Sequence, residues 1–141
     1  MKINKYIHIL VVYTIVFFTG SQVQAQEQEI RNLFREHINA FNKEDLPGTV
    51  SAYHSKSPVF GPYVQGIQFT FRDYDLEASL DNLVYLGEND GFAIIQVKVT
   101  TERNGGNAYK DNTTIQLYVF KKENTRWKVW SNMTIEAKPT R

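Results

Sequence analysis

The chain has 141 residues, with 16 Lys and Arg, 15 Asp and Glu, and no Cys. This near balance of charge excludes the basic surface of a nucleic-acid-binding protein and the polybasic patch of a membrane-surface protein. The absence of Cys excludes disulfides, thiol catalysis and thiolate metal sites, so the stability of the fold must come from packing.

Residues 1–25 are predicted to be a cleaved signal peptide. Lys2 and Lys5 precede the apolar run Ile7–Phe18, and Val23-Gln24-Ala25 places small residues at the −3 and −1 positions of a cleavage site. The apolar run is shorter than the roughly 20 residues that a membrane-spanning helix needs. We therefore expect a periplasmic or secreted protein without a membrane span after cleavage; the alternative is an uncleaved anchor.

Two helices are predicted at the start of the mature domain. The segment Glu27–Glu44 carries one apolar stripe at spacings of three and four, formed by Ile30, Leu33, Phe34, Ile38 and Phe41. Asp45 is suited to cap a second helix, with Pro47 in its first turn, where a missing N–H costs nothing. That second helix is expected to end near His54.

The next segment, Val59–Asp75, has a mixed pattern. Gly61-Pro62 and Gly66 mark turns, and Ile67, Phe69 and Phe71 alternate as in a strand. The spacing of Ile67, Phe71 and Tyr74 also fits a helix, so the pattern alone leaves both interpretations open.

The rest of the chain is predicted to be four antiparallel strands separated by polar turns. Their alternating apolar residues define the segments Leu76–Leu86, Phe92–Glu102, Thr113–Phe120 and Arg126–Ile135. Helices followed by consecutive strands indicate an α+β protein with its helices on one face of a curved sheet. We expect a single domain over residues 26–135 and a disordered polar tail over 136–141.

Several segments resemble the nuclear transport factor 2-like superfamily, especially its SnoaL-like and ketosteroid-isomerase-like bacterial members. The similarity is carried by Phe41–Leu46 with Tyr53-His54, by Phe71–Leu76, by Gly91–Val97, and by Tyr109–Thr114 with Lys122–Val129. The resemblance implies a cone: a curved antiparallel sheet wrapped around two to three N-terminal helices, as in a cystatin-like roll, with an apolar cavity. It also implies a helix over about Gln65–Asp73 and a homodimer formed through the sheet.

The resemblance does not choose a reaction, because this fold hosts isomerases, cyclases, dehydratases and non-catalytic modules. An isomerase of this kind needs a carboxylate base in an apolar cavity. Asp73, Asp75, Asp81 and Asp111 are available, but none matches the catalytic positions of the family.

The best catalytic candidates are His54 and Asp111. His54 follows the second helix. It is suited to proton transfer near neutral pH or, as a cation, to complementing the C-terminal end of the helix dipole. Asp111 precedes a strand and is suited to act as a base at the mouth of the cavity, or to bind local backbone N–H groups. His37 is expected at the rim of the first helix.

Metal and cofactor sites are not predicted. The histidines after residue 25 lack paired ligand spacing, no serine lies in a nucleophile elbow, and no glycine-rich loop opens a helix. Trp127 and Trp130 fall on opposite faces of the last strand. One is therefore expected in the core and the other on the outer face, where it would suit a dimer interface.

The leading hypothesis is an exported protein that binds a small apolar or amphipathic molecule in the cone. The expected ligand-binding residues are Phe34, Ile38, Phe41, Tyr53, His54, Phe71, Asp111 and Trp130. The alternatives are a cofactor-independent isomerase, cyclase or lyase that uses His54 or Asp111, and a non-catalytic dimeric interaction module.

Overall fold

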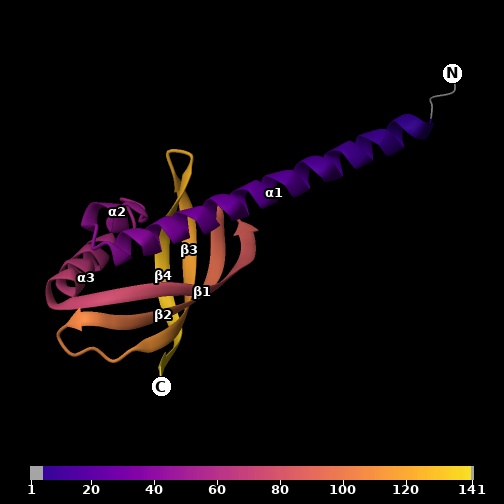
Figure 1. The fold of residues 1–141 in the computed structure, drawn as a ribbon. Helices are drawn as coiled ribbons and strands as arrows, with labels where there is room; N and C mark the ends of the chain where they lie inside the picture. Colours follow the sequence, from indigo (N-terminus) through magenta and orange to yellow (C-terminus); the bar gives the residue numbers. More distant parts are fainter. Residues whose placement is uncertain (1–4, 141) are drawn as a thin grey trace.

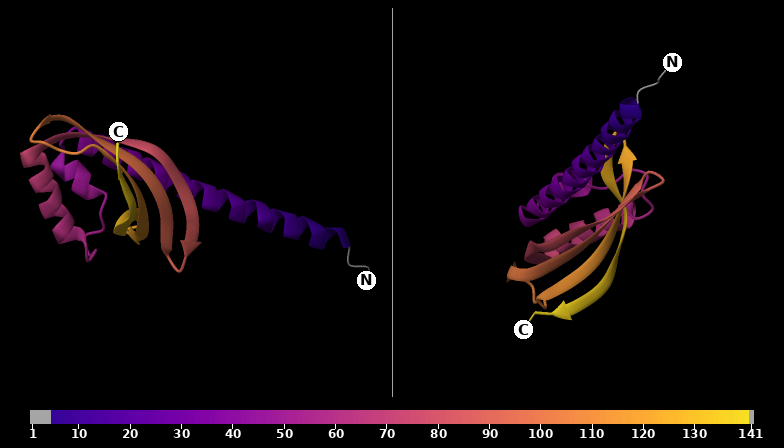
Figure 2. Two further views of the ribbon diagram at one scale, coloured as in Figure 1. Left: turned by 90° about the horizontal axis from the view of Figure 1, so that it is seen from below. Right: turned by 90° about the vertical axis from the view of Figure 1, so that its right-hand side faces the viewer.

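The computed structural model describes the backbone of residues 5–140 and the side chains of residues 23–140. Three helices precede a four-stranded antiparallel sheet of order β1-β2-β3-β4. The elements are α1 (Lys5–Asn42), α2 (Leu46–Ser51), α3 (Phe60–Asp73), β1 (Tyr74–Asn89), β2 (Phe92–Gly106), β3 (Asn112–Glu123) and β4 (Arg126–Pro139). The sheet bends around the helices, which lie on its concave side (Figures 1 and 2). The expected α+β cone is confirmed.

The first helix, α1, continues through the predicted cleavage site at Ala25 and extends past the sheet at its N-terminal end (Figure 1). Lys2 and the side chains of the predicted apolar run, Ile7–Phe18, lie outside the described residues, so the signal peptide stays a prediction. Among the described residues, no helix combines the length and the apolar character needed to cross a bilayer.

The second and third helices begin at polar or proline-containing segments. Asp45 caps α2, as expected, because its carboxylate accepts the backbone N–H of Gly48 at 3.0 Å. The third helix starts at Phe60, earlier than the predicted Gln65. Gly61-Pro62, expected to form a turn, lies in its first turn, where the missing N–H of proline leaves no helical bond unmade.

Two tight hairpin turns set the register of the sheet. Asp90-Gly91 has φ values of 51° and 77°, and Asn124-Thr125 has φ values of 47° and 72°. Two-residue turns with positive φ at both central positions match the twist of antiparallel strands. Register shifts in β1, including one between Leu80 and Asn82, mark bulges, which bend a strand and increase its twist.

The C-terminal end differs from the expectation of a disordered tail over 136–141. Strand β4 continues to Pro139, which lies opposite Asn112 of β3, and the Thr140 N–H donates to the Asp111 carbonyl at 2.9 Å. Pro139 is tolerated there because β4 is an edge strand, and the backbone groups on its outer edge need no partner strand.

The core lies between the concave face of the sheet and α1. It contains Ile30 and Phe34 of α1 together with Ala93, Ile95, Val97, Val99, Tyr118, Phe120, Trp127 and Val129 of the sheet. The chain after α2 is tied to this core, because Tyr53 forms a parallel bridge with Val129. One of the two tryptophans of the last strand was expected in the core, and it is Trp127, at 1% exposure.

Candidate ligand-binding cavity

A cavity of about 200 Å³ lies between the helices and the concave face of the sheet. Five Phe and Tyr side chains and one His contribute to its lining, and no charged side chain is part of it in the described structure. The lining residues are Phe34, His37, Ile38, Phe41, Tyr53, Tyr63, Ile67, Ala78, Val99, Thr101, Gln116, Tyr118 and Asn132.

Aromatic rings form two walls of the cavity. Tyr53 and Tyr63 are stacked, with ring centroids 3.8 Å apart and planes inclined by 19°. Phe34 meets Tyr118 edge to face at 4.9 Å. The edge-to-face arrangement is favoured by the ring quadrupoles, and both pairs present apolar ring surface to the cavity.

A hydrogen-bonded histidine lies beside these rings. The Nδ1 atom of His37 is 3.1 Å from the carbonyl oxygen of Thr49, and its Nε2 atom is 3.3 Å from the Tyr63 hydroxyl. A carbonyl only accepts, so Nδ1 carries the proton of the neutral ring. Nε2 is then an acceptor, and Tyr63 donates to it.

Burial keeps the cavity electrically neutral. Desolvation lowers the pKa of His37 to about 4, so its imidazole is uncharged at neutral pH. Desolvation likewise raises the pKa of Tyr53, Tyr63 and Tyr118, so their hydroxyls stay protonated. The cavity therefore offers neutral donors and acceptors.

Further polar groups come from β3 and β4. The Tyr118 hydroxyl donates to Gln116 Oε1 at 3.0 Å, and Gln116 Nε2 donates to the Thr114 hydroxyl at 2.8 Å. Asn132 lies opposite Tyr118 in the register, with its Oδ1 atom 3.5 Å from the Tyr53 hydroxyl. A ligand in the cavity would thus meet two carboxamides, of Gln116 and Asn132, and two hydroxyls, of Thr101 and Tyr118, on its sheet side.

The predicted ligand-binding residues divide into two groups. Phe34, Ile38, Phe41 and Tyr53 line the cavity. Phe71 lies behind this lining and packs on the Phe41 ring at 5.5 Å. The apolar stripe of the first helix was therefore a sound guide to the cavity.

His54, Asp111 and Trp130 are not brought to the cavity. His54 packs edge-on against Trp130 at 5.0 Å and accepts the Lys56 N–H at 3.0 Å. Trp130 is half-buried at a bulge of β4, with the Lys121 ammonium 4.5 Å from its ring, and does not lie open on the outer face. Asp111 accepts the Arg103 N–H at 2.9 Å, the local backbone role considered for it above.

His37 is the main residue that the sequence interpretation misplaced. It was expected at the rim, but it is buried, with 7% exposure. It lies between the buried Phe34 and the partly buried Phe41 in the series Ile30, Phe34, His37, Phe41, whose spacings of four, three and four define one face of a helix. Polar residues of β3 and β4 were missed because alternation identifies the inward face of a strand but not the depth of each position.

The sequence matches the family model of the C-terminal domain of the anti-sigma-I factor RsgI9 over residues 32–139. The chain belongs to this family. The matched residues contain the part of α1 that lines the cavity, both shorter helices and all four strands. No curated protein matches the chain significantly.

Solved structures show that this member of the RsgI9 C-terminal domain family has the NTF2-like fold. A cystatin-like-fold protein of unknown function from Nostoc punctiforme has a TM-score of 0.64 and 17% identity, over 81% of this chain and 92% of that chain. An NTF2-like protein of unknown function from Pseudomonas putida has a TM-score of 0.66 and 14% identity, over 79% and 86%. A proposed scytalone dehydratase from Novosphingobium aromaticivorans has a TM-score of 0.66 and 9% identity, over 84% and 89%.

These structural similarities establish a common fold. The chemistry of each protein depends on the residues of its own cavity. In the described part of this RsgI9 C-terminal domain family member, no group of three His, Asp or Glu side chains is arranged to hold a metal ion. The lining of the cavity provides hydrogen-bonding groups and aromatic contacts.

Proposed function

We propose that the protein is an exported binding protein for a small uncharged molecule with an aromatic or otherwise flat apolar body. The observation that carries this proposal is the neutral, aromatic-lined cavity of about 200 Å³. A cavity of roughly 150 Å³ lined by apolar side chains holds benzene. The cavity therefore suits one ring with short substituents.

The polar groups of the cavity would orient such a ligand. Small-molecule sites are mainly apolar, with a few polar groups that fix the orientation of the ligand. Gln116, Tyr118 and Asn132 provide these groups from neighbouring strands. The family is named for a domain of an anti-sigma factor, a regulatory protein, which supports recognition over turnover.

Binding can be tested by calorimetric titration with benzyl alcohol. Val99→Phe places a ring in the cavity, and Val119→Phe makes the same change outside the cavity, on the opposite face of the sheet. We expect the wild type and Val119→Phe to bind equally and Val99→Phe to bind at least tenfold more weakly. Circular dichroism establishes that each variant is folded. No heat of binding in the wild type, or equal binding by all three proteins, contradicts the proposal.

Cofactor-independent proton transfer is a second candidate function. The Tyr63–His37 hydrogen bond at 3.3 Å favours it, because an imidazole beside a bound ligand is a potential base. We rank it second because a histidine with a pKa of about 4 is a weak base at neutral pH. In this second function, His37 takes the place of the predicted catalytic candidates His54 and Asp111, which lie away from the cavity.

The proton-transfer hypothesis has a direct assay. Exchange of the α protons of cyclohexanone in D₂O, followed by NMR, measures abstraction beside a carbonyl. An enzyme would accelerate this exchange, and His37→Gln would remove the acceleration. Binding without accelerated exchange supports a binding protein.

Export is part of the proposal and is supported by the pattern of residues 1–25. Expression with the natural N-terminus should yield a mature protein in the periplasm or medium that begins at Gln26. N-terminal sequencing that finds an intact leader on the protein would reject cleavage after Ala25.

We also propose a homodimer through the convex face of the sheet. One cross-strand row of this face runs from Val84 through Gln96 and Leu117 to Met133; three of these four side chains are apolar, and Met133 is 60% exposed. An exposed, mainly apolar surface of this kind is typical of a protein–protein contact. Sedimentation of the wild type should show a dimer and Met133→Lys a monomer; a wild-type monomer at micromolar concentration would reject this assembly.

A further inference from the structure

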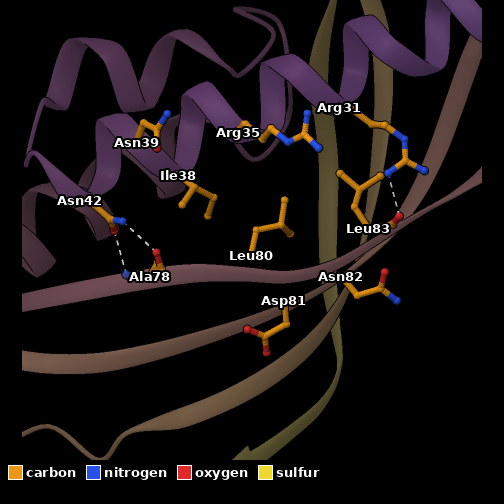
Figure 3. Close-up of a pocket in the computed structure, with 10 residues that line it drawn as sticks. All are labelled: Arg31, Arg35, Ile38, Asn39, Asn42, Ala78, Leu80, Asp81, Asn82 and Leu83. Carbon is orange, nitrogen blue, oxygen red and sulfur yellow. Dashed lines mark hydrogen bonds between the residues drawn. The ribbon is translucent and has the colours of Figure 1, made fainter.

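A second hollow, of about 520 Å³, lies between α1 and the edge strand β1 (Figure 3). One polar stripe of α1 faces it, formed by Arg31, Arg35, Asn39 and Asn42 at spacings of four, four and three. Residues at these spacings share a face of a helix. The stripe therefore runs along the outer edge of β1. We call this hollow the edge groove.

Both ends of the edge groove are closed by hydrogen bonds. Asn42 donates to the Ala78 carbonyl and accepts the Ala78 N–H, each at 2.8 Å. At the other end, Arg31 donates to the Leu83 carbonyl at 2.9 Å (Figure 3). Arg31 also pairs with Glu27 at 2.7 Å. These contacts cover the strand edge and block a peptide strand from running through the groove.

The middle of the edge groove keeps a cation without a partner. Within the described residues, no carboxylate lies within 4.0 Å of the Arg35 guanidinium, whereas Arg31 is paired. Asp81 turns away from α1 (Figure 3). It accepts the Thr100 hydroxyl at 2.7 Å and lies 3.9 Å from the Lys98 ammonium. The groove therefore presents one unpaired positive charge above the apolar side chains of Ile38 and Leu80.

The edge groove and the ligand-binding cavity share a wall. Ile38 and Ala78 belong to the lining of both. Ala78 is small, and its backbone is held by Asn42, so the partition is made by one flexible side chain and one methyl group. A molecule bound in the cavity thus lies one residue layer from the groove.

We propose that the edge groove and the cavity are two parts of one site for an aromatic carboxylic acid. The ring occupies the cavity and the carboxylate binds Arg35, with the linking atoms between Ile38 and Ala78. A planar carboxylate matches the fork of a guanidinium, and one unpaired Arg matches one negative charge. This inference rests on the proposed function, since it assigns the ring to the same cavity.

The test compares 4-phenylbutyrate with its uncharged analogue, 4-phenyl-1-butanol, by calorimetric titration at low salt. Charge-assisted hydrogen bonds are worth about 1.5–3 kcal/mol, so the wild type should bind the acid at least tenfold more tightly than the alcohol. Arg35→Gln should bind the two equally, with the affinity for the alcohol unchanged. Arg103→Gln, which removes an exposed Arg outside the groove, should retain the preference.

The outcomes separate this inference from the proposed function. Binding of the alcohol with no preference for the acid overturns the carboxylate site and leaves the cavity proposal intact. Failure of both compounds to bind contradicts the proposed function. Acetate that binds as tightly as 4-phenylbutyrate would overturn the shared site, because the groove would then act alone. Val99→Phe should weaken the acid and the alcohol alike; an unaffected acid would also overturn the shared site.

Discussion

The Tyr63 hydroxyl donates to Nε2 of His37 at 3.3 Å, and the opposite nitrogen of the same ring donates to the Thr49 carbonyl at 3.1 Å. This chain of neutral groups links α3 to α1 and α2 beside the cavity. It needs an uncharged imidazole, because a protonated ring has no lone pair to accept the tyrosine hydroxyl. A change in the protonation state of His37 should therefore affect both the stability of the helical layer and the shape of the cavity.

The stability of the fold should therefore fall in mild acid. Burial lowers the pKa of His37 from 6.5 to about 4, so the unfolded chain binds a proton in this window that the folded chain does not. Stability is complete above pH 6.5 and is lost as pH falls toward 4. We expect a loss of about 2 kcal/mol by pH 5, mostly above the range where carboxylates titrate. Denaturant unfolding at several pH values measures it.

His37→Gln provides the control for this effect, since glutamine does not titrate. The variant should be less stable than the wild type at pH 7 but nearly independent of pH between 6.5 and 5. His54→Gln is a second control, because it removes a histidine that lies away from the cavity, and it should keep the acid-induced loss of stability of the wild type. A wild-type curve that stays flat over this range, or a loss that persists in His37→Gln, would show that His37 is not buried as a neutral ring.

The same substitution at two helical glycines should have opposite effects. A Cβ at Gly48 would lie 2.2 Å from the Asp45 carboxylate and displace the cap of α2. A Cβ at Gly66 of α3 meets nothing within 4 Å. Gly48→Ala should cost about 1 kcal/mol of unfolding free energy, and Gly66→Ala should add about 1 kcal/mol. Thermal unfolding compares them; a gain from Gly48→Ala would mean that the cap is not needed.

Thr125 should be a site of backbone strain. It is β-branched and has a φ of 72° in the β3–β4 turn. Such residues rarely adopt positive φ, whereas glycine does so without cost. Thr125→Gly is expected to raise the unfolding free energy by about 1 kcal/mol. Asn124→Gly is the matched control, with a change near zero, because asparagine tolerates this conformation; equal effects at both positions would refute the assignment of strain to Thr125.

The covered edge of β1 gives a further stability prediction. Asn42 makes two hydrogen bonds to Ala78, whereas Asn39, one turn earlier on the same stripe, makes none within the described residues. Asn42→Ala should cost about 1–2 kcal/mol, because both backbone groups lose a partner. Asn39→Ala should be neutral. Equal costs in chemical denaturation would show that Asn42 does not hold α1 to the sheet.

Local patterns carried most of the fold. The stripe from Ile30 to Phe41 predicted the buried face of α1, Asp45 with Pro47 predicted the start of α2, and alternation predicted the four strands. The ends of the elements were less certain. Asn112–Ile115 pairs with the tail as far as Pro139, a long-range contact with no signal in a polar sequence.

The cavity was only partly visible in the sequence. Aromatic residues at helical spacing pointed to it, and Phe34, Ile38, Phe41 and Tyr53 do line it. His54 and Asp111 were chosen for their chemistry, but distance from the cavity is a tertiary property that residue type does not encode. The edge groove depends on the angle between α1 and β1, which the sequence does not give. The unpaired Arg35 of this groove was therefore not predicted either.

Binding of a small aromatic molecule in the cavity can be observed by an NMR titration of the labelled protein with benzyl alcohol. We expect saturable shifts centred on Tyr53, Val99, Tyr118 and Asn132, and their disappearance in Val99→Phe. Shifts confined to the convex face of the sheet, or no saturable shifts at millimolar ligand, would contradict it.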